Sequence, residues 1–288
     1  FALAGHEVRL LESSPERRRA IPDVIDSIMQ ELRIAGALRN EDATAATNLI
    51  QLVEGWPAFA ATSLVIEAIP EILDAKRELY RQLEAVITTD AVLASNTSGL
   101  MPDDLSAGMQ RPERFLIIHF WNPPHAIPLV EIVPGTRTDP RIVEATFALL
   151  KQIGSEPVIL RKAVPGFVGN RIQFAVLREA LNLVEAGVAD PATIDTVVKT
   201  SLGRRYGIVG PFEAADLGGL ETFLRVATHL LPELSADGRG LEVLRAHLAR
   251  GETGAASGAG FYRWTPERRE AVRQKRIAHQ LKGRAGQA

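Results

Sequence analysis

Three short apolar segments in the middle of the chain constrain its fold more than any other feature. Each is followed by one polar side chain, and these side chains are Ser98, His119 and Glu131. Apolar segments of this length, bounded by Gly, Pro and Asn, are typical of buried strands in a parallel sheet. Because ligands bind beyond the carboxyl ends of such strands, the sequence predicts that the three side chains share one cleft.

A hydroxyl, an imidazole and a carboxylate in one cleft suit proton transfer from a substrate. Histidine has an ordinary pKa near neutrality, so His119 is the candidate base. Glu131 on one ring nitrogen would fix the tautomer and favour the imidazolium, while the Ser98 hydroxyl could hold the oxygen that loses its proton. Taken singly, each residue also has a structural interpretation, as a turn serine, a packed histidine or an edge-strand charge. Their order and spacing, with Asn170 downstream, favour a site.

The pattern along the chain divides it into an α/β half and a helical half. Apolar runs typical of strands alternate with helical periodicity up to residues 162–165, which have the character of a domain boundary. Helices follow, among them one expected over residues 211–231. We predict a Rossmann-type α/β fold with a doubly wound, mostly parallel sheet in residues 1–162, and an all-helical domain in residues 163–288. Residues 41–60 fit no element clearly.

A strand that ends in an acidic residue lies near the start of the sequence. Glu12 closes the segment 7–12, and Ser14 and Pro15 are typical of a helix start. A dinucleotide-binding fold uses such an acid to hold ribose hydroxyls, and its G-x-G-x-x-G loop stands about 20 residues earlier. Only 11 residues precede Glu12, and they contain no such loop. We therefore expect the natural protein to have about 20 further residues that carry the first strand and the glycine loop.

The composition argues against several other classes of protein. The formal net charge is −2 over 288 residues, so no strong positive field would recruit nucleic acid or an acidic membrane. The chain has no cysteine, so disulfides, thiolate metal sites and a cysteine nucleophile are excluded, and we expect no metal. No apolar run reaches the roughly 18 residues of a membrane span, and no signal-peptide pattern is present. We expect a cytoplasmic protein.

Six motifs together point to a known family. They are Ser95-Asn96-Thr97-Ser98, His119-Phe120-Trp121-Asn122-Pro123, Leu129-Val130-Glu131, Pro165-Gly166-Phe167-Val168-Gly169-Asn170-Arg171, Gly210-Pro211-Phe212-Glu213 and Gly258-Ala259-Gly260-Phe261-Tyr262. With these motifs the chain resembles the NAD-dependent 3-hydroxyacyl-CoA dehydrogenase family, including its branch of λ-crystallin and L-gulonate 3-dehydrogenase. The separations of 21 residues from Ser98 to His119 and 12 residues on to Glu131 fit the family pattern.

The resemblance implies a role for each candidate residue. His119 would remove the hydroxyl proton while hydride leaves for the nicotinamide of NAD, and Glu131 would orient and polarise His119. Ser98 would hydrogen-bond the reacting oxygen, and Asn170 would complete the polar site. Glu12 would bind the ribose hydroxyls of the cofactor. The other positions that match cofactor contacts of the family are Glu71, Lys76, Asn96, Ser98 and Asn122.

The resemblance leaves the substrate open. The family usually has Asp where this chain has Glu12, and either carboxylate repels a 2′-phosphate, which favours NAD over NADP. Acyl-CoA members carry lysines on the helix after that acid, whereas residues 15–60 contain none. The leading expectation is still interconversion of an L-3-hydroxyacyl-CoA and its 3-ketoacyl-CoA, a reaction of fatty acid metabolism. The alternatives are an L-gulonate 3-dehydrogenase-like enzyme for a free 3-hydroxy acid and a non-catalytic, crystallin-like structural protein. A homodimer formed through the helical domain is also expected.

Overall fold

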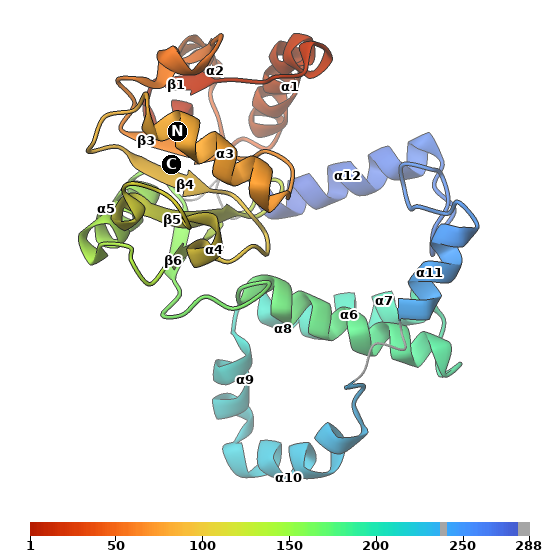
Figure 1. The fold of residues 1–288 in the computed structure, drawn as a ribbon. Coiled ribbons are helices and arrows are strands. Elements are labelled where there is room, and N and C mark those ends of the chain that lie inside the picture. The colour runs from red at the N-terminus through yellow and green to blue at the C-terminus, as the bar shows by residue number, and fades with distance from the viewer. Residues whose placement is uncertain (237–240, 282–288) are drawn as a thin grey trace. The chain divides into compact units, whose positions relative to one another are not determined.

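The computed structural model describes residues 1–236 and 241–281 and divides the chain into two compact units. The first unit contains Phe1–Asn170 together with the residues from Val272 onward, and the second contains Arg171–Ala271. Figure 1 shows strands and helices in the first unit and helices in the second. An α/β unit followed by an all-helical unit agrees with the fold class predicted from the sequence.

The division between the units differs from the predicted boundary between residues 162 and 163. It falls after Asn170, near the start of helix α6 (Gly169–Glu185). The backbone and side-chain groups of residues 168–170 hydrogen-bond to the first unit, which keeps this segment there. The last helix, α12 (Pro266–Leu281), also belongs to the first unit over most of its length.

The main sheet of the first unit has five strands in the order in which they follow along the chain. All neighbouring strands run parallel except β5 and β6, which are antiparallel. The sequence analysis placed all the central segments in a parallel sheet, and this pair is a correction. Only eight residues connect the two strands, whereas a parallel crossover needs a dozen or more. The strands are β3 (Leu64–Glu67), β4 (Val92–Ser95), β5 (Phe115–Phe120), β6 (Leu129–Pro134) and β7 (Glu156–Ile159).

A second, smaller sheet precedes the main one. It pairs β1 (Val8–Leu10) with β2 (Ile50–Leu52) in parallel. Strand β2 was not predicted from the sequence, because a strand of three residues that is mostly exposed shows no apolar alternation. Within the described residues no strand joins β1 to β3, so the sheet stays in two parts. This agrees with the expectation of a doubly wound sheet without its first strand.

Helices cover both faces of the main sheet. Phe115 and Ile117 of β5 pack with helix α3, whereas Leu116 and Ile118 pack with helix α5 on the opposite face. This alternation follows from the two-residue period of a strand. The helices and 3₁₀ turns of the first unit are η1 (Ala2–Ala4), α1 (Pro15–Ile34), α2 (Asn40–Asn48), η2 (Trp56–Phe59), α3 (Leu73–Glu84), α4 (Pro102–Leu105), η3 (Pro112–Arg114), α5 (Pro140–Gln152) and α12.

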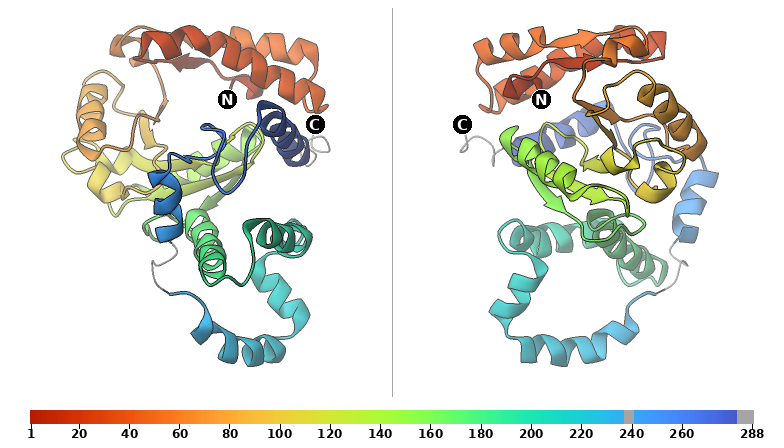
Figure 2. Two further views of the ribbon diagram at one scale, coloured as in Figure 1. Left: turned by 90° about the vertical axis from the view of Figure 1, so that its right-hand side faces the viewer. Right: turned by 60° about the vertical axis from the view of Figure 1, so that its left-hand side comes forward.

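The helix starts and stops agree with the cap residues in the sequence. The Ser14 side chain accepts a hydrogen bond from the backbone N–H of Arg17 at the start of α1, and Asp139 caps α5 in the same way. Alpha helix α1 ends just before Gly36, whose φ of 71° suits a residue without a Cβ. Figure 2 shows α1 lying beside α2, and both pack through Met29 and two buried alanines.

In its described part the second unit contains helices, irregular segments and two isolated β-bridges at Ala259. The helix expected over residues 211–231 is broken into α9 and α10, because Gly219 between them has a φ of 85° that ends a helix. No helix in the described ranges is long and apolar enough to cross a membrane. Besides most of α6, the unit contains α7 (Pro191–Thr200), α8 (Leu202–Tyr206), α9 (Pro211–Gly218), α10 (Leu220–Leu230), η4 (Leu231–Glu233) and α11 (Leu241–Ala249).

Candidate active site

His119 and Glu131 form a buried hydrogen-bonded pair across two strands. The register of the antiparallel pair places His119 of β5 directly opposite Glu131 of β6. The His119 Nδ1 and Glu131 Oε2 atoms lie 2.8 Å apart, and the two residues are 5% and 0% exposed. Glu131 therefore lies in the first half of its strand, not at a carboxyl end as the sequence analysis expected. The antiparallel direction of β6 is the reason, and it still brings the carboxylate to the imidazole.

Glu131 accepts hydrogen bonds on both of its carboxylate oxygens. Oε1 accepts the backbone N–H groups of Val168 and Gly169, each at 3.0 Å. Oε2 accepts the Trp121 indole N–H at 3.3 Å as well as His119. Burial by itself would raise the pKa of Glu131, but the bonds from His119, the two backbone groups and Trp121 outweigh it and lower the pKa below its ordinary value. The carboxylate is therefore ionised at neutral pH.

An ionised Glu131 decides which nitrogen of His119 carries the proton. A carboxylate only accepts hydrogen bonds, so the neutral imidazole must carry its proton on Nδ1. Its Nε2 atom then has a lone pair, and no residue in the described ranges hydrogen-bonds to it. The ring packs against Phe167, with 5.4 Å between the ring centroids. In its neutral form, His119 is thus held in one orientation with the Nε2 lone pair unbonded.

A turn with unusual backbone angles aims the two N–H groups at Glu131. Gly166 has a φ of 76°, and Phe167 has a φ of 51°, a value that is uncommon for a residue with a side chain. Phe167 is completely buried, so packing holds it in this conformation. A Cβ at Gly169 would overlap the Trp121 indole, which explains why glycine stands where the helix meets the ring.

Ser98 lies in the exposed turn after β4. Its backbone N–H donates to Glu71 Oε1 at 3.2 Å, and its carbonyl oxygen accepts the Asn170 side-chain amide at 3.4 Å. No described residue hydrogen-bonds to its hydroxyl, which leaves that group available for a ligand. The structure therefore brings Ser98 and Asn170 together, as the sequence analysis expected of the polar site.

Two residues predicted to contact the cofactor lie beyond strand ends, where Glu12 is half-buried and Glu71 is exposed. Glu12 follows β1, where its carboxylate accepts the Ser14 backbone N–H at 2.8 Å and lies 3.4 Å from the Arg17 guanidinium. Glu71 follows β3 and is exposed. Burial raises the pKa of Glu71, but its bonds with Thr97 and its interaction with the ammonium group of a neighbouring lysine lower it by more.

The other residues predicted to contact the cofactor differ in how far their polar groups are already bonded within the protein. Asn122 is exposed just beyond β5. The Asn96 side-chain oxygen accepts the Phe120 backbone N–H at 2.9 Å, so it ties the ends of β4 and β5 together. The Lys76 side chain is only 1% exposed, with its ammonium group on the Glu67 carboxylate and the Ile69 carbonyl oxygen. The ammonium group of Lys76 is therefore occupied by protein partners, and its contact with the cofactor stays a prediction.

These residues fit a dinucleotide at the carboxyl ends of the strands. Glu12 after β1, Glu71 after β3 and Ser98 after β4 each present a polar group at the edge where ligands of doubly wound sheets bind. Glu12 would bind ribose hydroxyls. The sequence contains no G-x-G-x-x-G loop ahead of Glu12, so no residue is assigned to the pyrophosphate.

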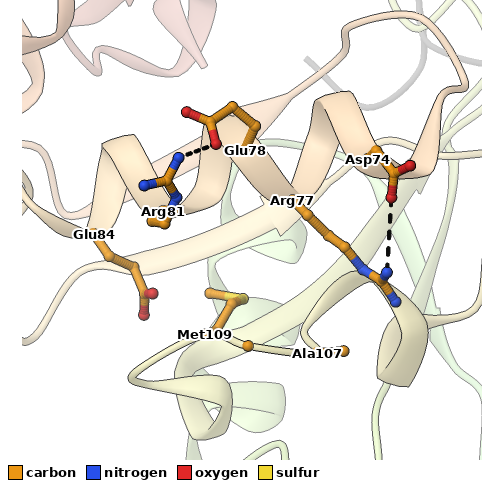
Figure 3. A pocket seen from close by; sticks show the side chains of 8 residues that line it. Asp74, Arg77, Glu78, Arg81, Glu84, Ala107 and Met109 are labelled. Atoms are coloured by element: carbon orange, nitrogen blue, oxygen red, sulfur yellow. Dashed lines mark hydrogen bonds and ion pairs between the residues drawn. The ribbon is translucent and has the colours of Figure 1, made fainter.

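A separate hollow on the first unit has a structural explanation. It lies between α3 and the turn after α4, and Figure 3 shows the Arg81–Glu78 and Arg77–Asp74 pairs along it. Its lining contains none of the predicted site residues, and its remaining charged side chain, Glu84, accepts backbone N–H groups. Within the described ranges, no group of His, Asp and Glu side chains is arranged to hold a metal ion.

Comparison with known families identifies the family to which the chain belongs. Residues 1–164 match the family described as 3-hydroxyacyl-CoA dehydrogenase, NAD binding domain, and residues 166–264 match 3-hydroxyacyl-CoA dehydrogenase, C-terminal domain. The chain belongs to the 3-hydroxyacyl-CoA dehydrogenase family. It is an NAD-dependent oxidoreductase of that family, and its cofactor is NAD.

Individual members of the family with similar sequences have differently named activities. The 5-formyl-3-hydroxy-2-methylpyridine 4-carboxylate 5-dehydrogenase of Mesorhizobium japonicum is 34% identical over 279 residues, which cover 96% of this chain and 89% of that protein. Rabbit (Oryctolagus cuniculus) λ-crystallin is 36% identical over 228 residues, covering 75% of this chain and 69% of that protein.

Solved structures of the family give the same fold. A 5-formyl-3-hydroxy-2-methylpyridine 4-carboxylic acid 5-dehydrogenase, described as an NAD⁺-dependent dismutase, has a TM-score of 0.87 at 33% identity and covers 98% of this chain and 91% of its own. The (S)-3-hydroxybutyryl-CoA dehydrogenase of Ralstonia eutropha has a TM-score of 0.73 at 32% identity, with 92% of each chain covered.

Sequence reasoning missed three parts of the site. Glu67 was not considered, although an acid that ends a buried strand is a signal worth following. The Trp121 N–H was not considered as a donor, although an indole N–H usually finds a partner when buried. The backbone N–H groups of Val168 and Gly169 could not be found from the sequence, because their direction depends on the tertiary turn.

Proposed function

We propose that this protein oxidises the hydroxyl-bearing carbon of a hydroxy acid, with His119 as the general base. The observation that carries the proposal is the buried 2.8 Å hydrogen bond between His119 Nδ1 and Glu131, together with the unbonded Nε2 atom. A histidine kept in one tautomer by an ionised carboxylate is suited to remove a hydroxyl proton near neutral pH.

The residues of the site account for the movement of the proton. NAD, when bound, accepts the hydride from the carbon that is oxidised. His119 Nε2 takes the proton of the substrate hydroxyl, so the product carbonyl forms without a free alkoxide. Glu131 stays ionised and stabilises the imidazolium. The Ser98 hydroxyl donates to the reacting oxygen, and Asn170 holds the Ser98 turn through its carbonyl oxygen. In the reverse direction the imidazolium returns the proton.

We infer that the substrate is a free hydroxy acid rather than a thioester. Residues 15–60 contain no lysine, although the acyl-CoA members carry lysines on the helix after the ribose-binding acid. In addition, the Mesorhizobium relative that covers 96% of this chain is named for a pyridine carboxylate. L-Gulonate and other free 3-hydroxy acids are the first compounds to test.

A 3-hydroxyacyl-CoA substrate is the second candidate. It is favoured by the similarity to the Ralstonia (S)-3-hydroxybutyryl-CoA dehydrogenase over 92% of both chains. The same catalytic residues would serve both substrates, since the reaction at the third carbon is the same. The distinction lies in residues that bind the rest of the substrate.

A substrate panel with NAD tests these proposals. The panel contains L-gulonate, 3-hydroxybutyrate, 3-hydroxybutyryl-CoA and the hydroxymethyl form of the pyridine carboxylate, and kcat/KM is measured for each. A higher kcat/KM for a free acid than for the thioester supports the first candidate, and the reverse order supports the second. If none of the compounds reduces NAD, the similarity to λ-crystallin would favour a structural protein. The intact set of Ser98, His119, Glu131 and Asn170 argues for catalysis.

A further inference from the structure

A second buried carboxylate, Glu67, lies beneath the exposed residues of the site. It is the last residue of β3, and its side chain is 0% exposed. The sheet register pairs it with Ser95, the last residue of β4. The reaction described above does not use it, and a buried charge is costly unless its hydrogen bonds are complete. The presence of this buried carboxylate beneath the site therefore calls for an explanation.

Four donors occupy the Glu67 carboxylate. Oε1 accepts the Ile69 backbone N–H and the Lys76 ammonium group, both at 2.6 Å. Oε2 accepts the Tyr80 hydroxyl at 2.6 Å and the Ser95 hydroxyl at 2.8 Å. A carboxylate has about four lone-pair directions, so this one is fully satisfied. Burial raises the pKa of Tyr80, and the bond to Glu67 raises it further, so the phenol stays a proton donor.

Two chains of contacts lead from Glu67 to the exposed edge of the site. In the first, Lys76 also lies 3.4 Å from Glu71 Oε2, so one ammonium group joins the buried and the exposed carboxylate. In the second, Ser95 Oγ accepts the Thr97 backbone N–H at 3.2 Å. Thr97 then donates its hydroxyl to Glu71 and accepts backbone N–H groups from the turn that follows.

The two chains meet at Glu71 and Ser98. The Thr97 hydroxyl on Glu71 Oε1 closes a ring of contacts through Lys76, Glu67 and Ser95, and the same Glu71 oxygen accepts the Ser98 backbone N–H at 3.2 Å. Four of its members, Glu67, Lys76, Ser95 and Thr97, are at most 4% exposed, whereas Glu71 and Ser98 are exposed. The two exposed residues are therefore held by the four buried ones.

We propose that Glu67 is a positioning residue of the enzyme: through Lys76 and Ser95 it holds Glu71 for the cofactor and the Ser98 hydroxyl for the reacting oxygen. The role of Ser98 in this statement rests on the proposed function. Lys76 is thereby assigned to this buried ring, as a link between two carboxylates, rather than to direct contact with NAD.

The variant Glu67→Gln tests the proposal, because it replaces the carboxylate by an amide of nearly the same shape. Glutamine offers one acceptor oxygen instead of two and adds two N–H donors, so two of the four present donors would face an N–H group. The ring should open at Lys76 or at Ser95. We expect a weaker affinity for NADH, measured by fluorescence titration, and a kcat/KM about 100-fold lower, as is typical when a reacting group is displaced by an ångström. Amide hydrogen exchange in residues 95–100 should become faster.

Glu84→Gln is the matched control. Glu84 is also a buried carboxylate of the first unit, and it accepts the Gln110 and Arg111 backbone N–H groups at 2.9 Å, beside the hollow in Figure 3 and away from Ser98. It should lower the urea midpoint but leave NADH affinity, kcat/KM and exchange in residues 95–100 unchanged. If Glu67→Gln does not fold, Ser95→Ala serves as the second variant, because it breaks only the second chain of contacts. It should lower NADH affinity and kcat/KM, and speed exchange in residues 95–100, by less than is expected for Glu67→Gln.

The possible results separate this proposal from the proposed function. If Glu67→Gln changes NADH affinity and exchange no more than Glu84→Gln does, Glu67 is only a stabilising residue and the proposal is overturned. If the unaltered protein oxidises no hydroxy acid, the proposed function fails, but NADH affinity and exchange still decide the role of Glu67. If the unaltered protein does not bind NADH either, exchange in residues 95–100 decides it.

Discussion

At the scale of single residues, the proposed chemistry depends on His119. If its Nε2 atom is the base, His119→Gln should lower kcat by about 100- to 10,000-fold, the usual cost of losing general-base catalysis. The affinity for NAD should change little, because the imidazole acts on the substrate proton. The measurement is kcat on folded, NAD-saturated protein, with folding checked by circular dichroism. A loss of less than about 10-fold would remove His119 from this role.

Glu131→Gln tests the second residue of the hydrogen-bonded pair. The amide keeps the shape of the side chain but stabilises an imidazolium less than the carboxylate does, so kcat should again fall strongly. The double variant should be little worse than either single variant, because His119 and Glu131 act as one unit. Effects that multiplied in the double variant would show that the residues contribute independently, which would contradict the hydrogen-bonded pair seen here.

The lowered pKa of Glu131 also predicts how stability depends on pH. Its pKa lies below the value of 4.5 expected for an unfolded chain, so the unfolded state binds more protons as the pH falls through this region. Glu131 therefore stabilises the folded state fully above about pH 4.5, and this contribution is lost as the pH falls through the lowered pKa. The difference in urea midpoint between the natural protein and Glu131→Gln should be largest near neutral pH and shrink in acid. A difference that grows in acid would have the wrong sign.

At the scale of elements, the start of α6 is coupled through Gly169 to the hydrogen-bonded dyad of His119 and Glu131. A Cβ there would overlap the Trp121 indole, so either the ring or the first turn of the helix must move. The ring donates to Glu131 Oε2 and the turn donates to Oε1, so either movement loosens Glu131. Gly169→Ala should lower kcat/KM by about 100-fold. Gly207→Ala is the control, because its Cβ would meet only ordinary contacts at 3.8 Å.

At the scale of the whole molecule, the helical unit exposes more apolar surface than an isolated domain usually does. Ile208 is 88% exposed, Phe212 86% and Leu217 79%, and these three lie in or beside α9. Large exposed apolar side chains in such numbers typically mark an interface, and a symmetric pair would cover the same residues on both copies. We propose a homodimer formed through this unit. Light scattering at micromolar concentration should give the mass of two chains.

Phe212→Asp should shift the mass measured by light scattering toward that of a single chain, because a charge at the centre of an apolar interface is poorly tolerated. Ile34→Asp is the control, since Ile34 is 72% exposed in the first unit and should not affect association. A single-chain mass for the natural protein, or equal effects of the two variants, would count against a dimer of this kind.

The amino-acid sequence by itself determined the fold class and the identity of the dyad. Its strand and helix patterns are local, because side-chain periodicity and cap residues such as Ser14 and Asp139 act within a few residues. The motifs around His119, Glu131 and Asn170 were specific enough to point to the family, which the comparisons then showed. These conclusions needed no knowledge of how distant segments pack.

The tertiary structure alone decided how the strands run and what each buried charge contacts. Strand β6 runs antiparallel to β5, which places Glu131 opposite His119. The short connection between the two strands is the cause, but the direction and register of the pair are known only from the structure. The family resemblance implied a cofactor contact for Lys76, and only the tertiary structure shows that its ammonium group bonds to Glu67, which ends a different element. Hydrogen bonds between residues far apart in the chain depend on packing, and local patterns carry no information about them.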